Sequence, residues 1–375
     1  MNKPSLVAVA AATLVATPSL SLADSDLLVY FGTYTDTTSK GIYVAGFNST
    51  TGKLEQPTLA AEAHDPSFVA IHPSHSYLYA VNENGGQILS YSITDATGKL
   101  KPLNSQPSGG GGPCHVSLDA TSKVLLVANY NTGHVASFPI LADGSIGPIA
   151  TDHLQGPASH ATGRQNEPHA HSFNMDRGNR FAVACDLGCD KIFSYRLDPA
   201  TAKLTPNDPA FVNAPAGGGP RHLAFAPSGK FAYANNEMAC TLTSYAYDGE
   251  KGILTPMESR STLPKGVAVI PDYSTAETLM HPTAKAVYVA NRGHDTIAFF
   301  AIAPSGQAEF VGAFPAHVKT PRNFGIDPSG RWMIVAGQDS DTVAVFSVDP
   351  DLGVPMFTGQ IVKLPKPVCV RFMKK

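Results

Sequence analysis

Short apolar segments bounded by turn residues recur along the whole chain. In residues 219–237, an apolar segment at 223–225 is followed by the turn Pro227-Ser228-Gly229 and a second apolar segment at 231–234. The polar side chains at the outer ends of this unit are Arg221, His222, Asn236 and Glu237. The start of one strand and the end of the next lie at the same edge of an antiparallel hairpin. The pattern therefore predicts a hairpin that brings these four side chains together.

The same unit begins six times, at spacings of roughly 45 to 56 residues, which is the range of four-stranded propeller blades. Its starting points are near Phe68, His115, His171, His222, Thr278 and Asn323. Each unit continues into a second hairpin, usually with a Gly-containing turn. Runs such as 124–128 and 286–290 are almost continuously apolar, as expected for inner strands packed between neighbouring blades. These runs are too short to be helices.

A seventh unit is split between the two ends of the chain. Residues 368–372 have the pattern of a lone first strand, and segments at 27–31, at 41–47 and after Gly52 supply the other three. Pairing the two ends closes a ring and removes open sheet edges. We therefore predict an all-β fold with almost no helix, a single seven-bladed β-propeller over residues 24–375. Its ring is closed by pairing the C-terminal strand with the N-terminal strands.

The first 23 residues have the pattern of a secretory signal peptide. Lys3 is followed by an apolar run from Leu6 to Val15 and by the small-residue site Ser21-Leu22-Ala23. The run is too short to span a bilayer. We therefore expect residues 1–23 to be a signal peptide, with a mature periplasmic chain that begins at Asp24 and is not inserted in the membrane. The net charge of −3 and the lack of a basic run exclude a nucleic-acid partner.

Histidines, arginines and carboxylates gather where first strands begin and second strands end, which is one face of the predicted ring. Before first strands stand His115, His169, His171, Arg221, His222, Glu277, Arg322 and Asn323. After second strands stand Asn82, Glu83, Asn129, Asp186, Asn236, Glu237, Asn291, Arg292, Gln338 and Asp339. Local turn chemistry explains Asn and Asp at such positions. It does not explain the histidines and arginines, so we interpret this rim as a binding or catalytic site.

Other chemistries have weaker support in the sequence. His169 and His171 could clamp a metal with His222, but arginines on the same rim oppose a cation there. The sequence contains no Gly-x-Ser-x-Gly motif, so a serine esterase has no support. The chain has five cysteines, of which Cys185 and Cys189 could pair after export, although small buried residues without chemistry are the favoured interpretation. We expect no metal and no cofactor.

The rim motifs resemble those of the seven-bladed propeller lactonase family, which groups propeller-type 6-phosphogluconolactonases with carboxymuconate cyclases. The matching segments are Gly112-Pro113-Cys114-His115-Val116-Ser117, Pro168-His169-Ala170-His171-Ser172, Gly219-Pro220-Arg221-His222, Asn236-Glu237, Asn291-Arg292-Gly293-His294-Asp295, Thr320-Pro321-Arg322-Asn323-Phe324 and Gly337-Gln338-Asp339-Ser340-Asp341. The resemblance covers essentially the whole mature chain. It implies metal-independent chemistry on a ring ester at the mouth of the channel. Lys191 stands where relatives often have Arg, which would alter contacts to an anionic group.

Carried over residue by residue, the resemblance implies catalytic roles for His171, Glu237, Arg221 and Arg322. We assign substrate binding to His115, His169, Asp186, His222, Asn236, Glu277, Arg292 and Gln338. Either Glu237 or His171 would take a proton from the attacking water, and arginines would stabilise the oxyanion. The expected partner is a small-molecule sugar lactone. Export favours an unphosphorylated aldonolactone such as glucono-1,5-lactone, and 6-phosphogluconolactonase and a non-enzymatic secreted binding propeller remain alternatives.

Overall fold

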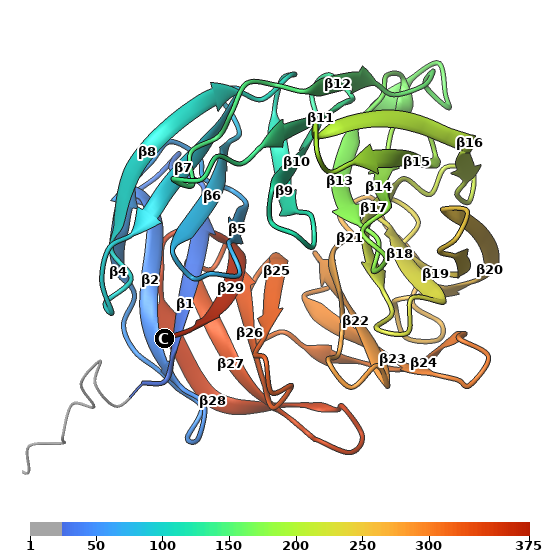
Figure 1. The fold of residues 1–375 in the computed structure, drawn as a ribbon. Coiled ribbons are helices and arrows are strands. Elements are labelled where there is room, and N and C mark those ends of the chain that lie inside the picture. Colours follow the sequence, from blue (N-terminus) through green and yellow to red (C-terminus); the bar gives the residue numbers. More distant parts are fainter. Residues whose placement is uncertain (1–24) are drawn as a thin grey trace, which may run out of the picture.

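A ring of seven antiparallel sheets surrounds a central channel in the computed structural model, which describes residues 25–375 (Figure 1). The predicted signal peptide lies outside the described residues. Blade 1 joins the two ends of the chain and contains β29 (Pro367–Lys374), β1 (Leu27–Thr33), β2 (Gly41–Asn48), β3 (Lys53–Leu54) and β4 (Thr58–Glu62). The predicted all-β, seven-bladed fold is confirmed.

Six further blades follow in chain order, each a four-stranded sheet with its first strand next to the channel. Blade 2 contains β5 (Val69–Ile71), β6 (Tyr77–Asn82), β7 (Gln87–Ile93) and β8 (Leu100–Pro107). Blade 3 contains β9 (Pro113–Leu118), β10 (Val124–Asn129), β11 (His134–Pro139) and β12 (Thr151–Leu154). Blade 4 contains β13 (Ala170–Met175), β14 (Phe181–Asp186), β15 (Lys191–Asp198) and β16 (Lys203–Asn213). Blade 5 contains β17 (Pro220–Phe225), β18 (Phe231–Asn236), β19 (Thr241–Asp248) and β20 (Ile253–Ser261). Blade 6 contains β21 (Ser274–Met280), β22 (Ala286–Arg292), β23 (Thr296–Ile302) and β24 (Ala308–Pro315). Blade 7 contains β25 (Pro321–Ile326), β26 (Trp332–Gly337), β27 (Thr342–Val348) and β28 (Pro355–Lys363). A short 3-10 helix, Gly163–Gln165, lies in the loop before β13.

The ring is closed by β29, which pairs antiparallel with β1 from Leu27↔Lys374 to Thr33↔Pro367 (Figure 1). The last strand of the chain therefore becomes the first strand of blade 1, as the sequence pattern predicts. Because β1 has a partner on both sides, its backbone groups offer no open edge at the closure. No helix within residues 25–375 is long and apolar enough to cross a membrane.

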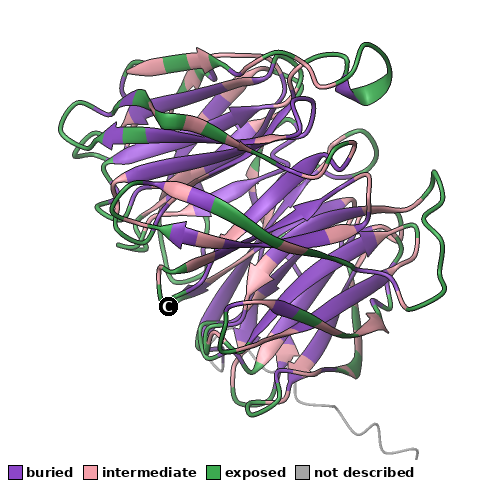
Figure 2. Cartoon of the chain, turned by 90° about the vertical axis from the view of Figure 1, so that its right-hand side faces the viewer, coloured by how far each residue is buried: buried purple, intermediate pink, exposed green. Residues whose placement is uncertain are grey.

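Burial falls from the inner strands of each blade to the outer strand (Figure 2). All residues of β10 and β14 are buried, as expected for strands covered on both faces by neighbouring blades. In contrast, β20 and β28 are largely exposed. All five cysteines are buried and free, and Cys189 Sγ donates to the carbonyl of Gly156 at 3.1 Å. Cys185 and Cys189 are therefore not bonded to each other.

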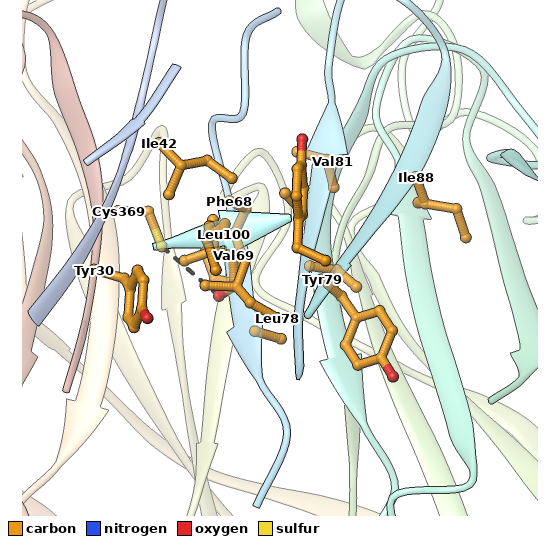
Figure 3. Close-up of a cluster of buried hydrophobic side chains, with 14 of the residues drawn as sticks. Tyr30, Ile42, Phe68, Val69, Leu78, Tyr79, Val81, Ile88, Leu100 and Cys369 are labelled. Carbon is orange, nitrogen blue, oxygen red and sulfur yellow. Dashed lines mark hydrogen bonds between the residues drawn. The ribbon is translucent and has the colours of Figure 1, made fainter. Parts of the chain in front are cut away.

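Apolar side chains fill the space between adjacent blades, as the cluster around Phe68, Val69 and Leu78 shows (Figure 3). Four buried tyrosines add a polar link at such boundaries, each donating from its hydroxyl to the carbonyl of a turn glycine in the next blade. These pairs are Tyr30 to Gly98 (3.0 Å), Tyr79 to Gly144 (3.0 Å), Tyr233 to Gly306 (2.8 Å) and Tyr288 to Gly353 (2.6 Å). The turn glycines between third and fourth strands thus connect each of these blades to its predecessor.

Gly306→Ala should lower the free energy of unfolding by about 2–3 kcal/mol. Gly306 has a φ of +86°, and an added Cβ would lie 2.1 Å from the Phe231 ring of the preceding blade. Left-handed backbone costs an L-residue about 1–2 kcal/mol, and overpacking adds to this cost. The matched control is Gly266→Ala, where φ is +88° and no heavy atom lies within 4 Å of the added Cβ. Equal midpoints for both variants in urea denaturation would show that the contact with Phe231 carries no stability.

Candidate active site

A β-bulge interrupts the pairing at the start of the first strand in six of the seven blades. An extra residue at a bulge is left out of the ladder and its side chain is redirected. The residues placed in these bulges are Cys114, His171, Arg221, His222, Ala276, Glu277, Arg322 and Val368. Most of the site residues that were predicted to precede first strands therefore lie within those strands, and most of them occupy the bulges that redirect their side chains.

Six of the eight bulge residues, all except Ala276 and Glu277, line a small inner cavity at the channel mouth. Its lining consists of Ser67, Phe68, Glu83, Cys114, His171, Arg221, His222, Arg322, Asn323 and Val368. The cavity has a volume of about 10 Å³, which is close to the space that one water molecule needs. His171, Arg221 and His222 are buried, whereas Glu83 and Arg322 are half-buried. Three of the four predicted catalytic residues, His171, Arg221 and Arg322, therefore surround a cavity about as large as one water molecule.

Glu237, the fourth predicted catalytic residue, is buried at 2% exposure and held by three arginines. Its Oε1 lies 2.8 Å from Arg164 Nη1 and 2.8 Å from Arg292 Nη2, and its Oε2 lies 2.8 Å from Arg221 Nε. Burial raises the pKa of a carboxyl, but Arg292, Arg221 and Arg164 outweigh it and hold the pKa of Glu237 well below its usual range. The Glu237 carboxylate is therefore ionised and a poor proton acceptor.

Arg221 connects Glu237 to the inner cavity. Its Nε is in ion-pair contact with Glu237 Oε2 without the alignment of a hydrogen bond, and its Nη1 is buried with no hydrogen-bond partner among the described residues. Burial lowers the pKa of Arg221 to about 10, against the opposing effect of Glu237. A charged guanidinium with a spare buried donor is suited to bind an oxygen that carries negative charge.

His171 lies against this ion cluster, with its Nε2 3.9 Å from Glu237 Oε2. On its other side, Nδ1 is 3.8 Å from Cys114 Sγ. Burial, reinforced by the charge of Arg221, lowers the pKa of His171 well below its ordinary value. The imidazole is therefore neutral near pH 7 and available to accept a proton.

His222 and Glu277 form a second buried pair. The Nδ1 of His222 is 2.7 Å from Glu277 Oε1, and Asn323 Nδ2 donates to Glu277 Oε2. Burial lowers the pKa of His222, while Glu277 acts in the opposite direction. With Nδ1–H donating to Glu277, the free lone pair lies on Nε2, which is buried and has no partner among residues 25–375. Its ring centroid is 5.4 Å from that of His171.

His115 and His169 surround the site without contacting its charged groups directly. The His115 ring packs against Phe68, with centroids 4.4 Å apart, and lies 5.5 Å from His222. His169 stacks on Tyr130 at 4.3 Å, and its Nδ1 donates to the Tyr130 carbonyl. Since the Tyr130 hydroxyl is 2.7 Å from Arg164 Nη2, His169 helps to place one of the arginines around Glu237.

Like His115, His169, Glu237, Glu277 and Arg292, four further residues that the sequence predicted for the site do not line the inner cavity. Asp186 Oδ1 accepts from the backbone of His169 and Cys189, and Asn236 Nδ2 donates within its own blade to Thr241 and Thr243. Gln338 Nε2 donates to the adjacent Asp339, and the Lys191 ammonium lies over the Phe211 ring of an outer strand. Asp186 and Asn236 therefore organise local backbone and hairpins, and the geometry offers no substrate contact through Lys191.

Arg164 and Tyr34 belong to the site although the sequence analysis does not name them, and Glu83, named there as a rim residue, received no catalytic or binding role. Arg164 lies in the loop at 155–167, far in sequence from Glu237, so no local pattern reveals their contact. Glu83 follows a second strand, as Glu237 does, and this position was the available signal. Tyr34 directly follows β1, the second strand of blade 1, and so occupies the same position. The Arg322 guanidinium lies over its ring, 5.3 Å from the ring centroid.

An outer cavity of about 640 Å³ opens beside the Glu237 cluster, within the size range of small-molecule sites. It is lined by Arg164, Glu237, Met238, Val269, Ile270, Pro271, Tyr273, Ser274 and Arg292. The stretch 264–275 supplies five of these residues, and the loop 155–167 contributes Arg164. Within residues 25–375, no three His, Cys, Asp or Glu side chains are grouped so as to hold a metal ion. The site is therefore an arginine-rich mouth over a histidine-lined inner cavity.

Comparisons with known proteins agree with this geometry. The family model "Lactonase, 7-bladed beta-propeller" matches residues 28–372. The chain is 34% identical to the 6-phosphogluconolactonase of Bacillus subtilis over 350 residues, covering 92% of this chain and 97% of that protein. The structure of the periplasmic gluconolactonase PpgL of Pseudomonas aeruginosa superposes with a TM-score of 0.87 at 33% identity, covering 92% of this chain and 99% of that chain. A putative 6-phosphogluconolactonase of Bacteroides fragilis gives a TM-score of 0.87 at 30% identity, covering 96% and 100%. The protein therefore belongs to the seven-bladed β-propeller lactonase family and is an enzyme that hydrolyses lactones.

Proposed function

We propose that this lactonase hydrolyses an unphosphorylated aldonolactone such as glucono-1,5-lactone in the periplasm. The observation that carries the mechanism is the unpartnered Nη1 of Arg221 beside the neutral imidazoles of His171 and His222. The signal-peptide pattern of residues 1–23 supports export. The likeness to a periplasmic gluconolactonase supports both compartment and substrate. Membership of a family of lactone-hydrolysing enzymes argues against the other alternative, a non-enzymatic binding propeller.

We assign the role of general base to His171 rather than to Glu237. Three arginines stabilise the Glu237 carboxylate as an anion, so it has little tendency to take a proton. The neutral His171 imidazole can accept one. Once protonated, the imidazolium faces Glu237 Oε2 at 3.9 Å, and this charge stabilises it. Glu237 thereby acts through His171 and through the arginines that it positions.

The reaction then proceeds by addition and elimination at the lactone carbonyl. His171 takes a proton from water as the water oxygen bonds to the carbonyl carbon, and Arg221 and Arg322 stabilise the oxyanion. Collapse of this intermediate breaks the bond to the ring oxygen, which receives the proton from the imidazolium. The product is an open-chain aldonic acid, which releases its carboxyl proton to solvent, and the resulting carboxylate suits the excess of guanidinium groups around the mouth. The crowding of arginines also disfavours a metal cation at this position.

6-Phosphogluconolactone is the second candidate substrate. Arg164, Arg221 and Arg292 share a single carboxylate partner, Glu237, so the mouth carries an excess of positive charge that would attract a phosphate. The 34% identity to the Bacillus subtilis 6-phosphogluconolactonase supports this alternative. It would fit a chain that retains residues 1–23 and stays in the cytoplasm.

Acid release from glucono-1,5-lactone and from its 6-phosphate should separate the two candidates. The assay uses purified residues 24–375, with spontaneous hydrolysis subtracted and with or without EDTA. We expect a higher kcat/KM for the unphosphorylated lactone and no effect of EDTA. A preference for the phosphate would support the second candidate, and loss of activity in EDTA would contradict the metal-independent mechanism. Fractionation of cells that produce the full chain tests the periplasmic location.

A further inference from the structure

Glu83 occupies in blade 2 the position that Glu237 occupies in blade 5. Each is the residue directly after a second strand, β6 and β18. Each also donates its backbone N–H to the residue before the proline that leads into the first strand of its blade: Glu83 to Asp65 at 3.1 Å and Glu237 to Gly219 at 2.7 Å. Equivalent backbone positions therefore bring both carboxylates to the same face of the channel.

The two carboxylates have opposite surroundings. Glu237 contacts three guanidinium groups, whereas the side-chain partners of Glu83 within the described residues are two hydroxyl groups. The Tyr34 hydroxyl lies 3.2 and 3.1 Å from the two oxygens of Glu83, and Ser67 Oγ donates to Oε2. Burial raises the pKa of Tyr34, so this phenol is a neutral donor. The hydrogen bonds of Glu83 thus come from hydroxyl donors, while Arg322, in the same cavity, interacts with it electrostatically without a hydrogen bond among the described contacts.

Glu83 has acceptor capacity that its partners do not use. A carboxylate offers about four lone-pair sites, and Tyr34 and Ser67 supply one proton each. Glu83 and Tyr34 are half-buried, and Glu83 lines the same inner cavity as His171 and Arg221. Because Glu83 and Arg221 line the same cavity, a lactone whose carbonyl binds Arg221 would also face Glu83.

We propose that Glu83 is a specificity-determining residue that accepts hydrogen bonds from the ring hydroxyl groups of a neutral sugar lactone. This inference rests on the proposed aldonolactone activity and extends it. A carboxylate surrounded by hydroxyl donors matches a further set of hydroxyls on the substrate. Its negative charge also opposes a phosphate or carboxylate substituent on the lactone ring, and of the cations around the inner cavity only Arg322 interacts with it electrostatically among the described contacts. Glu83 would thereby oppose the attraction that the arginines exert on anionic lactones.

The test compares Glu83→Gln with the wild type on glucono-1,5-lactone and on δ-valerolactone, which has the same ring size and no hydroxyl groups. We expect kcat/KM for gluconolactone to fall by about 10- to 100-fold, mainly through KM. We expect kcat/KM for δ-valerolactone to change less than about threefold. With 6-phosphogluconolactone as a third substrate, the variant should gain preference for the phosphate. Glu309→Gln, at an exposed position on the outer strand β24, is the matched control and should behave as the wild type.

The outcomes distinguish this inference from the function on which it rests. An active wild type whose Glu83→Gln variant loses activity equally on both neutral lactones would overturn the inference, because a structural or catalytic role moves both. An unchanged variant would overturn it as well. A wild type without activity on gluconolactone would refute the proposed function and the inference with it. If Glu83→Gln is poorly folded by its melting temperature, Glu83→Asp keeps the charge and should retain the preference for gluconolactone over δ-valerolactone.

Discussion

Replacing His171 by Gln should lower kcat/KM for the lactone by about 10² to 10⁴-fold, the usual contribution of a general base. Gln fills similar space but cannot take a proton from water. The inner cavity keeps Arg221 and Arg322, so residual hydrolysis through oxyanion stabilisation is expected. Initial rates of acid release over a range of lactone concentrations measure the loss. His75→Gln, the same change in the exposed β5–β6 turn, should leave the rate unchanged.

The pH profile provides an independent readout of the same role. A base must be unprotonated, and burial and Arg221 lower the pKa of His171 well below the ordinary value. The base therefore stays competent as the pH falls, and kcat/KM should be flat from pH 8 down to about pH 6. A base with an unshifted imidazole would instead lose activity with a midpoint near pH 6.5. Such a midpoint would contradict the assignment of a buried, neutral His171.

His222 offers the sharpest alternative to His171. Its Nε2 is unpartnered in the same cavity and its Nδ1 is fixed by Glu277. If His171→Gln retains most of the activity and His222→Gln loses it, the base is His222 with Glu277 as its orienting carboxylate. A large loss in both variants, with an altered pH profile only for His171→Gln, would keep His171 as the base and leave His222 as a hydrogen-bond acceptor.

The fold was predictable because the chain repeats one design. Apolar runs such as 124–128 and 286–290 recur at the blade period. One repeat unit is divided between the two ends of the chain, and this division predicts the pairing of β29 with β1. A repeated pattern supplies several independent observations of the same element, so a local ambiguity in one blade is resolved by the others. The turn glycines were visible too, but not their contacts across blades. The contact between Gly306 and Phe231 depends on how adjacent blades pack, which no local pattern describes.

The site was only partly predictable. Strand order places His171, Arg221 and Glu237 at one face, and the sequence was sufficient for that step. The bulges that redirect His171 and Arg322 into the channel are departures from the regular two-residue period, so the pattern cannot reveal where each side chain points. Arg164 reaches Glu237 from an irregular loop, and such a contact depends on the tertiary path of that loop. The choice between Glu237 and His171 as the proton acceptor depends on the three arginines that contact Glu237, and the sequence does not reveal these contacts.

Replacing Glu237 by Gln should lower the free energy of unfolding by about 3–5 kcal/mol, the cost of removing one partner from a buried charge pair. The change leaves Arg221, with 3% of its side chain exposed, next to Arg292 without a compensating anion. Arg164 is half exposed and can turn to water, so the cost arises mainly from the other two. The matched control is Glu250→Gln, which removes a carboxylate from Arg180 in a pair that is largely exposed. Little or no change is expected there, because solvent screens such pairs.

The same variant should also lose lactonase activity, since Glu237 positions Arg221 and faces the imidazolium that forms on His171. Denaturant midpoints at pH 7 measure the stability, and kcat/KM measures the activity. The depressed pKa of Glu237 means that its contribution to stability is fully present above its unfolded-state pKa and is lost only as the pH falls through the folded value. The gap between wild type and variant should therefore be constant from pH 6 to 8 and shrink in strong acid. A Glu237→Gln protein no less stable than Glu250→Gln would mean that the buried arginines do not depend on this carboxylate, and the charge cluster would lose its place as the organising element of the site.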